Sequence, residues 1–341
     1  MLSEFKDDNI VRYYNSWIVE NFSISSVLEN DNSYNSLYSA SISETSYKNT
    51  SALFIQMELC ECSLADELMA KHLDSKKRMK IFKDIISGLY YIHKKDIIHH
   101  DLKPQNILLS NDKYKIADFG LSFPSDEQDK VHDAGTVLYK APEIKHEFNS
   151  DMYSLGIILF EMCISDKYKN TIKTINHIKE LEVSDNFPKN FEDNYPIEYF
   201  FIKRLIYKDP QSRLSSEVLY QAFTNGFFYD KGKKELVLFV NWNDTMRKNY
   251  YLTRAEVIFI GYNVDRIETS SFNNFEGLKE IFIPNSVTSI NDNAFSNCSK
   301  LANIAIPNTV TSIGESAFHS YITKHFDSFL ISHYYSLHTH F

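Results

Sequence analysis

The last third of the chain carries a 23-residue repeat, and this feature restricts the possible fold more than any other. Ile258, Ile281 and Ile304 lie 23 residues apart. Three further apolar columns keep the same spacing: Val264, Val287 and Val310; Ile267, Ile290 and Ile313; Phe272, Phe295 and Phe318. Repeats of this length are typical of solenoids, in which each turn buries its apolar side by stacking on its neighbours. The sequence therefore predicts a short β-rich solenoid over residues 258–320.

The repeating unit, Ile281 to Leu301, resembles the BspA-like class of leucine-rich repeat. Because three turns are near the minimum for a stable solenoid, we expect support from residues 226–257, a linker in which Lys234 to Trp242 is a candidate capping strand. Residues 321–341 leave the repeat register and are expected to be an irregular tail. A protein partner is the expected ligand of the repeats, through polar residues free to face it. These polar residues are Asn285, Ser286, Thr288 and Ser289. Two alternatives are an unrelated β-rich domain and a repeat that only caps the preceding domain.

Length and charge limit the classes of partner. The chain has 341 residues, enough for two domains, and a formal net charge of -9, which argues against nucleic-acid binding through bulk electrostatics. No apolar run approaches the roughly 18 residues that a membrane span needs, and the first residues lack an apolar signal core. The 4 cysteines are too scattered for a disulfide framework. We expect a soluble protein of the cytoplasm, or of the nucleus, that binds neither nucleic acid nor membranes.

The first two thirds of the chain show strand patterns followed by helical ones. Ile10 to Val19 and Ala52 to Leu59 mix β-branched and aromatic residues as strands do. Residues 22–51 between them are rich in serine and poor in large aliphatic residues, which predicts a flexible insertion. From Lys76 to Lys95 the apolar residues recur at three- and four-residue steps, which predicts an amphipathic helix. Helical patterns then dominate from Asp151 to Ala222.

A cluster of polar residues in this part of the chain has the composition that phosphoryl transfer needs. Asp101, Lys103 and Asn106 place a carboxylate, an ammonium and a carboxamide within six positions, and Asp118 supplies a second carboxylate. Transfer of a phosphoryl group from ATP uses a carboxylate to orient the acceptor hydroxyl, a cation for the developing charge, and two oxygen ligands for magnesium. The residue types therefore favour a kinase.

The spacing of these residues resembles that of eukaryotic serine/threonine protein kinases. Asp118-Phe119-Gly120 follows Asp101 by 17 residues, and Ala141-Pro142-Glu143 follows Asp118 by 23. Asp151 and Arg213 come next, in kinase order. The resemblance covers residues 1–225 and implies an α+β, protein-kinase-like fold with a partial small lobe and a mainly α large lobe, followed by the solenoid.

The resemblance also implies roles for individual residues. Asp101 corresponds to the catalytic base, and Lys103 to the lysine that contacts the transferring phosphate. Asn106 and Asp118 correspond to the ligands of Mg²⁺. ATP is the implied phosphoryl donor, and Leu108 would lie under its adenine.

Within the kinases, Asn9 to Trp17 and Leu53 to Glu61 resemble the enzymes that phosphorylate the alpha subunit of translation initiation factor 2. Those kinases carry an insertion between the fourth and fifth strands of the small lobe, where the predicted insertion falls here. On this alignment Met57 is the gatekeeper, and Glu58 and Cys60 offer backbone groups to adenine. The implied substrate is that alpha subunit, in translational stress control. Wee-type cell-cycle kinases share part of these motifs and are a second interpretation.

Two departures from the family pattern bear on activity. A glycine-rich loop, a strand lysine and a helix glutamate are expected before Asn9, and eight residues precede it here. We therefore expect the chain as written to be a poor kinase, either truncated or a pseudokinase that acts as a protein-interaction module. His100 stands where the family usually has arginine, which predicts weaker control by phosphorylation of the activation loop.

Overall fold

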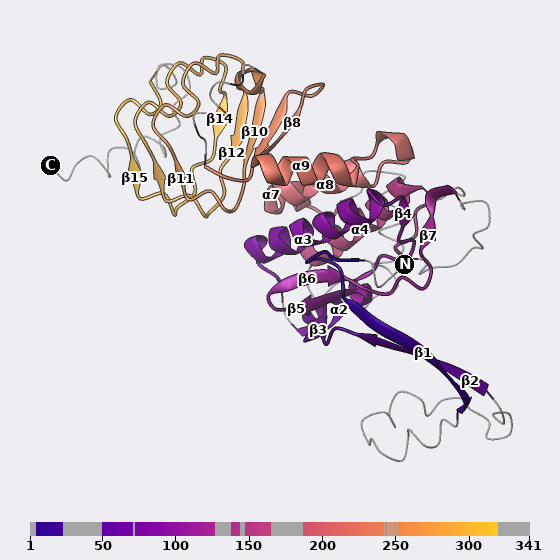
Figure 1. Ribbon diagram of the computed structural model, residues 1–341. Helices are drawn as coiled ribbons and strands as arrows, with labels where there is room; N and C mark the ends of the chain where they lie inside the picture. Colours follow the sequence, from indigo (N-terminus) through magenta and orange to yellow (C-terminus); the bar gives the residue numbers. More distant parts are fainter. Residues whose placement is uncertain are drawn as a thin grey trace.

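The computed structural model shows a helical lobe with a projecting β hairpin on one side and a solenoid on the other (Figure 1). It describes residues 5–22, 50–70, 72–126, 138–143, 147–164, 187–241, 243, 246, 249 and 251–319. The helices and sheets confirm the expected α+β class. Within the described residues, no helix is both long enough and apolar enough to span a bilayer.

The hairpin consists of β1 (Tyr13–Phe22) and β2 (Thr50–Met57), which pair antiparallel and extend away from the lobe (Figure 1). Trp17 stacks on Phe54 of the opposite strand, with ring centroids 5.6 Å apart. The two strands flank the predicted insertion, and residues 23–49 of it lie outside the described part of the chain.

A small sheet follows and packs on the first long helix. It contains β3 (Cys62–Ser63), β5 (Ile107–Ser110) and β6 (Lys113–Ile116), with α2 (Leu64–Ala70) directly after β3. The long helix is α3 (Ser75–His93), which confirms the predicted amphipathic helix. The Asp74 carboxylate begins it by accepting a hydrogen bond from the backbone N–H of Lys77. The buried face of α3 carries Met79, Ile81, Phe82, Ile85, Ile86, Leu89 and Ile92.

Two short strands and a single turn shape the region that follows α3. The strands are β4 (Ile97–Ile98) and β7 (Phe123–Pro124), which pair antiparallel, and the turn is η2 (Pro104–Asn106). The loop that contains Asp101 and Lys103 runs from β4 to η2.

In the described residues from 147 to 225, the lobe is mainly helical. Its segments are α4 (Phe148–Cys163), α7 (Phe191–Asn194), α8 (Pro196–Leu205), η4 (Pro210–Ser212) and α9 (Ser216–Asn225). Almost every residue of α4 is buried, so this helix is the centre of the lobe. Helix α8 packs closely on it, since a Cβ added at Gly156 would lie 2.8 Å from the Cβ of Leu205.

Two buried ion pairs connect distant parts of the lobe. The Arg78 guanidinium on α3 lies 2.8 Å from the Glu198 carboxylate on α8, and both side chains are almost fully buried. The Arg213 guanidinium, directly after η4, contacts the Glu143 carboxylate before α4 at 2.6 Å. Such pairs fix the relative positions of elements because a lone buried charge is costly.

The solenoid is built from two sheets, in which every strand pair is parallel except the one at the lobe end of the first sheet. One sheet has the order β14-β12-β10-β9-β8, from β8 (Phe227–Asp230), β9 (Glu235–Leu238), β10 (Val257–Ile260), β12 (Glu280–Phe282) and β14 (Asn303–Ile304). The other contains β11 (Arg266–Ile267), β13 (Ser289–Ile290) and β15 (Ser312–Ile313), and η5 (Leu252–Arg254) precedes β10. In the first sheet Ile258 pairs with Ile281 and Ile281 with Ile304. The 23-residue columns are therefore real stacks.

The stacked columns form a core of their own. Phe272, Phe295 and Phe318 stack nearly parallel, with successive ring centroids 5.4 and 5.3 Å apart. Two of the polar residues expected to face a partner, Ser286 and Thr288, also form bonds within the solenoid, and their contact with a partner stays a prediction. Their hydroxyls donate hydrogen bonds to backbone carbonyls of the preceding turn. Residues 320–341, including the expected irregular tail, lie outside the described part of the chain.

The lobe and the solenoid are joined by strand β9. It pairs with β8 on the lobe side and with β10 on the repeat side, so the lobe ends inside the sheet of the repeats. Its residues alternate between two cores: Leu236 and Leu238 pack with the repeat columns, whereas Val237 and neighbouring Phe239 pack with the helices of the lobe. The two parts therefore share one strand rather than a flexible linker.

Candidate active site

The predicted loop residues form one connected cluster after β4. Asp101 is 8% exposed, and the Lys103 ammonium lies 2.5 Å from its carboxylate. The amide nitrogen of Asn106, on η2, donates to the backbone oxygen of Asp101 at 2.8 Å and to its carboxylate at 3.2 Å. The structure thus brings together the three residues whose spacing predicted a phosphoryl-transfer loop.

Asp151, in the first turn of α4, binds the backbone of this loop just before Asp101. Its carboxylate accepts hydrogen bonds from the backbone N–H groups of His99 at 2.8 Å and His100 at 2.9 Å, and it lies 3.0 Å from Nε2 of His93. Burial by itself raises the pKa of Asp151, but the interactions of its carboxylate with His93 and His99 together outweigh burial, so the pKa falls below its ordinary value. A buried carboxylate therefore fixes the backbone that precedes Asp101.

The second predicted carboxylate, Asp118, is tied to the same cluster through the backbone. The N–H of Ala117 donates to the carbonyl of Asn106 at 2.9 Å. Asp118 itself is exposed and has a φ of 61°, in the left-handed region, and its carboxylate accepts a hydrogen bond from Gly120 N–H at 3.3 Å. The structure thus places Asp118 next to the residue that pairs with Asn106.

Two residues that sequence reasoning did not single out position this segment. Tyr13 of β1 accepts a hydrogen bond from the Asp118 N–H through its hydroxyl, at 3.2 Å, and its ring contacts Phe119. His99 is fully buried between Asp101 and Ala117. The sequence signal for both was weak, because their contacts depend on residues that are far away along the chain.

The ring of His99 has one hydrogen-bonding state that satisfies both of its neighbours. Nδ1 accepts from the backbone N–H of Asp101 at 3.4 Å, and Nε2 donates to the carbonyl of Ala117 at 3.0 Å. This is the neutral ring, and burial lowers the pKa of His99 below its ordinary value. The neutral histidine therefore links the loop of Asp101 to the segment of Asp118.

The cluster fits a divalent cation held partly by a bound nucleotide. The amide nitrogen of Asn106 is fixed by Asp101, which leaves the amide oxygen as a ligand, and Asp118 offers a carboxylate. Magnesium typically takes one or two protein oxygens together with substrate phosphates. In keeping with such a sparse protein set, the described residues contain no cluster of three or more His, Cys, Asp or Glu side chains that could hold a metal.

The residues predicted to face adenine lie where β2 ends and the chain crosses to β3. The N–H of Glu58 donates to the carbonyl of Arg12 at 2.8 Å, so this donor is used within the protein. The carbonyl oxygen of Glu58 can still accept a hydrogen bond. The Cys60 thiol lies 3.7 Å from this carbonyl. Met57 is 43% exposed, and Leu108 lies on β5 opposite Ser63 of β3. Leu108 lies on the strand that follows the loop of Asp101, and the contact of all four residues with a nucleotide stays a prediction.

The Glu58 side chain has a separate, structural task. Its carboxylate lies 2.5 Å from the Lys115 ammonium on β6 and accepts a hydrogen bond from the Ser110 hydroxyl at 2.7 Å. These bonds attach the crossing segment to the sheet of β5 and β6. The backbone groups of Glu58 and Cys60 are thereby held next to Leu108.

Comparison with known proteins agrees with this geometry. Residues 1–224 match the family described as protein kinase domain, and residues 245–332 match the BspA type leucine rich repeat region in six copies. The protein-kinase-like fold and the repeat class expected from the sequence are thus confirmed.

Individual relatives point to one group of kinases. The chain is 33% identical over 195 residues to "eIF-2-alpha kinase GCN2" of Schizosaccharomyces pombe and 34% identical over 202 residues to its namesake of Homo sapiens; each alignment covers 50% of this chain and 12% of the relative. It is 31% identical over 233 residues to "Interferon-induced, double-stranded RNA-activated protein kinase" of Mus musculus, covering 64% of this chain and 41% of the relative. The chain therefore spans well under half of the length of these relatives.

Proposed function

Because this chain belongs to the protein kinase family, we propose that it transfers the γ-phosphate of ATP to a serine or threonine of the alpha subunit of translation initiation factor 2. The observation that carries the proposal is the connected cluster of Asp101, Lys103 and Asn106, with Asp118 joined to it through Ala117. The names of the relatives support the choice of substrate. A regulator of translation would act in the cytoplasm, with the nucleus as a second compartment.

Each residue of the cluster has a chemical task in this proposal. The Asp101 carboxylate accepts a hydrogen bond from the substrate hydroxyl and directs it at the phosphorus. Lys103, which lies against Asp101, offers a positive charge to the phosphoryl oxygens as charge develops there. Asn106 and Asp118 would hold magnesium, which when bound neutralises charge on the phosphates. Met57, Glu58, Cys60 and Leu108 would border the adenine.

The test is phosphate transfer by the purified chain to the recombinant alpha subunit with labelled ATP. Asp101→Asn and Asp118→Asn should each reduce transfer by about 10² to 10³. Their melting temperatures should stay close to that of the wild type, since asparagine has nearly the same shape. Asp112→Asn is the matched control, because Asp112 lies in the exposed turn between β5 and β6. Wild-type turnover by the Asp101 variant would overturn the assignment of the site.

The substrate is tested separately from the site. If the chain phosphorylates a mixed serine/threonine peptide library but not the alpha subunit, the site assignment stands and the substrate assignment is wrong.

A pseudokinase that binds proteins is the second candidate, and the hairpin favours it. Apolar side chains on both hairpin strands face solvent: Ile18 is 66% exposed and Leu53 is 63% exposed. An apolar surface of this kind suits contact with another protein. Calorimetry with Mg-ATP separates the two candidates. We expect this chain to bind Mg-ATP weakly, as a pseudokinase or a poor kinase would. Micromolar affinity or better would favour the enzyme.

A further inference from the structure

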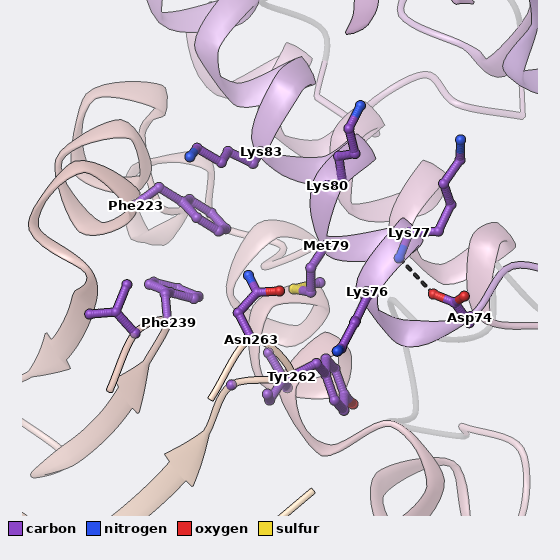
Figure 2. A pocket seen from close by; sticks show the side chains of 13 residues that line it. Asp74, Lys76, Lys77, Met79, Lys80, Lys83, Phe223, Phe239, Tyr262 and Asn263 are labelled. Carbon is purple, nitrogen blue, oxygen red and sulfur yellow. Dashed lines mark hydrogen bonds between the residues drawn. The ribbon is translucent and has the colours of Figure 1, made fainter. Parts of the chain in front are cut away.

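A cavity of about 510 Å³ opens where the lobe meets the first turn of the repeats, away from the cluster of Asp101 (Figure 2). One wall is the first half of α3, and the opposite wall is the segment after β10 that contains Gly261, Tyr262 and Asn263. The floor is apolar and consists of Met79, Ile197, Phe223 and Phe239. A volume of this size is in the range of ligand pockets, and it can hold one large side chain of a peptide ligand together with the adjacent residues of that peptide.

Two lysines on the α3 wall offer positive charge to this cavity. In Figure 2 the ammonium of Lys76 lies beside Tyr262, and Lys83 extends along the edge above Phe223. Both are exposed, and in the described part of the chain neither makes an ion pair. The Asp74 carboxylate also borders the cavity, but it caps the helix by accepting from the backbone of Lys77.

The other two lysines of this wall are directed elsewhere. Lys77 lies 3.7 Å from the Glu67 carboxylate, and Lys80 lies 3.5 Å from Asp84. The ammonium groups of both point away from the apolar floor in Figure 2. Lys76 and Lys83 are therefore the cations that remain for a ligand, on a chain whose net charge is -9.

The walls of the cavity are fixed before any ligand binds. The Tyr262 hydroxyl donates to the Glu198 carboxylate at 2.8 Å, and Glu198 is paired with buried Arg78. The Gly261 N–H donates to the carbonyl of Leu238 at 2.7 Å, so close that a Cβ at Gly261 would lie 2.2 Å from this oxygen. A site that is already formed loses little conformational entropy when it binds a ligand.

A second hollow of about 650 Å³ shares Asp74, Lys76, Ile197 and Tyr262 with the first. It continues between the lobe and β12, next to Phe282, and the Asp193 and Glu280 carboxylates line it, so a carboxylate of a ligand would be repelled there. The name junction groove is used below for the first cavity alone, because its lining carries the lysines of α3.

We propose that the junction groove binds an acidic peptide segment of a protein partner, with one large apolar side chain of that segment seated on Met79 and Phe239. The apolar floor selects the anchor, and Lys76 and Lys83 pair with carboxylates on either side of it. A concave apolar floor argues for a protein segment, because nucleic acids and membrane surfaces bind through flatter and more extensive positive surfaces. This site is independent of phosphoryl transfer.

The experiment measures fluorescence anisotropy of the full chain with a labelled octapeptide of alternating glutamate and leucine that has one central phenylalanine. We expect micromolar binding that weakens at least tenfold in the Lys76→Glu/Lys83→Glu variant. The matched control is Lys94→Glu/Lys95→Glu, two exposed lysines at the other end of α3, which should bind as the wild type does. A peptide with serine in place of the apolar residues, and one with lysine in place of glutamate, should not bind.

A second measurement locates the ligand without a substitution. With ¹³C-methyl methionine, the Met79 signal should shift on titration of the acidic peptide, whereas Met152 and Met162, buried in α4, should not. Equal affinity of the two lysine variants, or an unchanged Met79 signal, overturns the proposal. Tight binding of an oligonucleotide or of anionic vesicles in place of the peptide, lost in the Lys76/Lys83 variant, would assign the lysines to a different class of partner and also overturn it.

Discussion

The lobe and the repeats are held together by contacts of different range. In the lobe, Arg78 and Glu198 lie 120 positions apart in the chain. In the repeats, the N–H of Thr311 donates to the carbonyl of Thr288, and the Asn297 side chain donates to Asn274, each bond joining residues 23 positions apart. The lobe buries charges in ion pairs, whereas the repeat columns are apolar. The lobe therefore depends on a few specific ion pairs between distant segments, whereas the repeats depend on many equivalent contacts between neighbouring turns.

The core of the lobe and the core of the repeats meet in β9, so we expect truncation before this strand to destabilise the protein more than any other change considered below. A chain that ends at Asp230 loses Val237 and Phe239 from the core of the lobe. We expect it to aggregate on expression, whereas a chain that ends at Asn241 keeps β9 and should unfold cooperatively at a lower temperature than the full chain. Circular dichroism and size-exclusion chromatography check both.

A soluble, folded chain ending at Asp230 would contradict this expectation. It would show that the lobe does not need β9 and that the repeats are a detachable recognition module. Because β9 belongs to both cores, we expect the repeats to stabilise the lobe and also to offer a surface to a protein partner.

The next largest effect concerns the buried charges at the junction. Glu198→Gln leaves Arg78 buried without its counter-charge and should lower the free energy of unfolding by about 3 kcal/mol. Tyr262→Phe removes only one hydrogen bond to Glu198 and should cost about 1 kcal/mol. Urea unfolding followed by circular dichroism measures both.

An exposed ion pair of the repeats provides the control for these substitutions. Arg266 and Glu268 lie 3.0 Å apart, with side chains 54% and 38% exposed, so Glu268→Gln should change the free energy of unfolding by less than about 1 kcal/mol. If Glu268→Gln costs as much as Glu198→Gln, the contrast between the two regions fails.

The smallest effect is a dependence of stability on pH that belongs to the lobe. Burial holds the pKa of His99 below its reference value of 6.5, so the unfolded chain binds more protons between the folded pKa and 6.5. This contribution is complete above about pH 6.5 and is lost as the pH falls through the folded pKa, at no more than about 1.4 kcal/mol per pH unit. In the repeats, burial raises the pKa of Cys298 to about 12, so that thiol does not titrate in this range.

Urea unfolding at pH 7.5, 6.5 and 5.5 tests this prediction. His99→Gln should flatten the decline, and His72→Gln, at an exposed position, should leave it unchanged. A decline that is the same in all three proteins would assign the sensitivity to other groups.

Some residues of the site could be found from the sequence because their meaning is local. Asp101, Lys103 and Asn106 lie within one loop, and the spacing to Asp118 reflects the short β5–β6 hairpin between them. His99 and Tyr13 could not be assigned in this way, since their roles arise from contacts with Ala117 and Asp118, which fold back on them. The hydrogen bonds of Ser286 and Thr288 could not be assigned either, because polar side chains that bond the preceding turn look the same in sequence as free ones.

The amino-acid sequence alone predicts the 23-residue solenoid, the amphipathic α3 and the composition of the phosphoryl-transfer loop. These features follow from spacing along the chain, which fixes what neighbouring turns and one loop bring together. Tertiary structure alone decided that β9 serves two cores, that Tyr262 joins the Arg78–Glu198 pair, and that Lys76 and Lys83 border an apolar cavity. The physical reason is that buried charges and cavities are created by packing between segments that are distant in sequence, and no local pattern encodes which segments will meet.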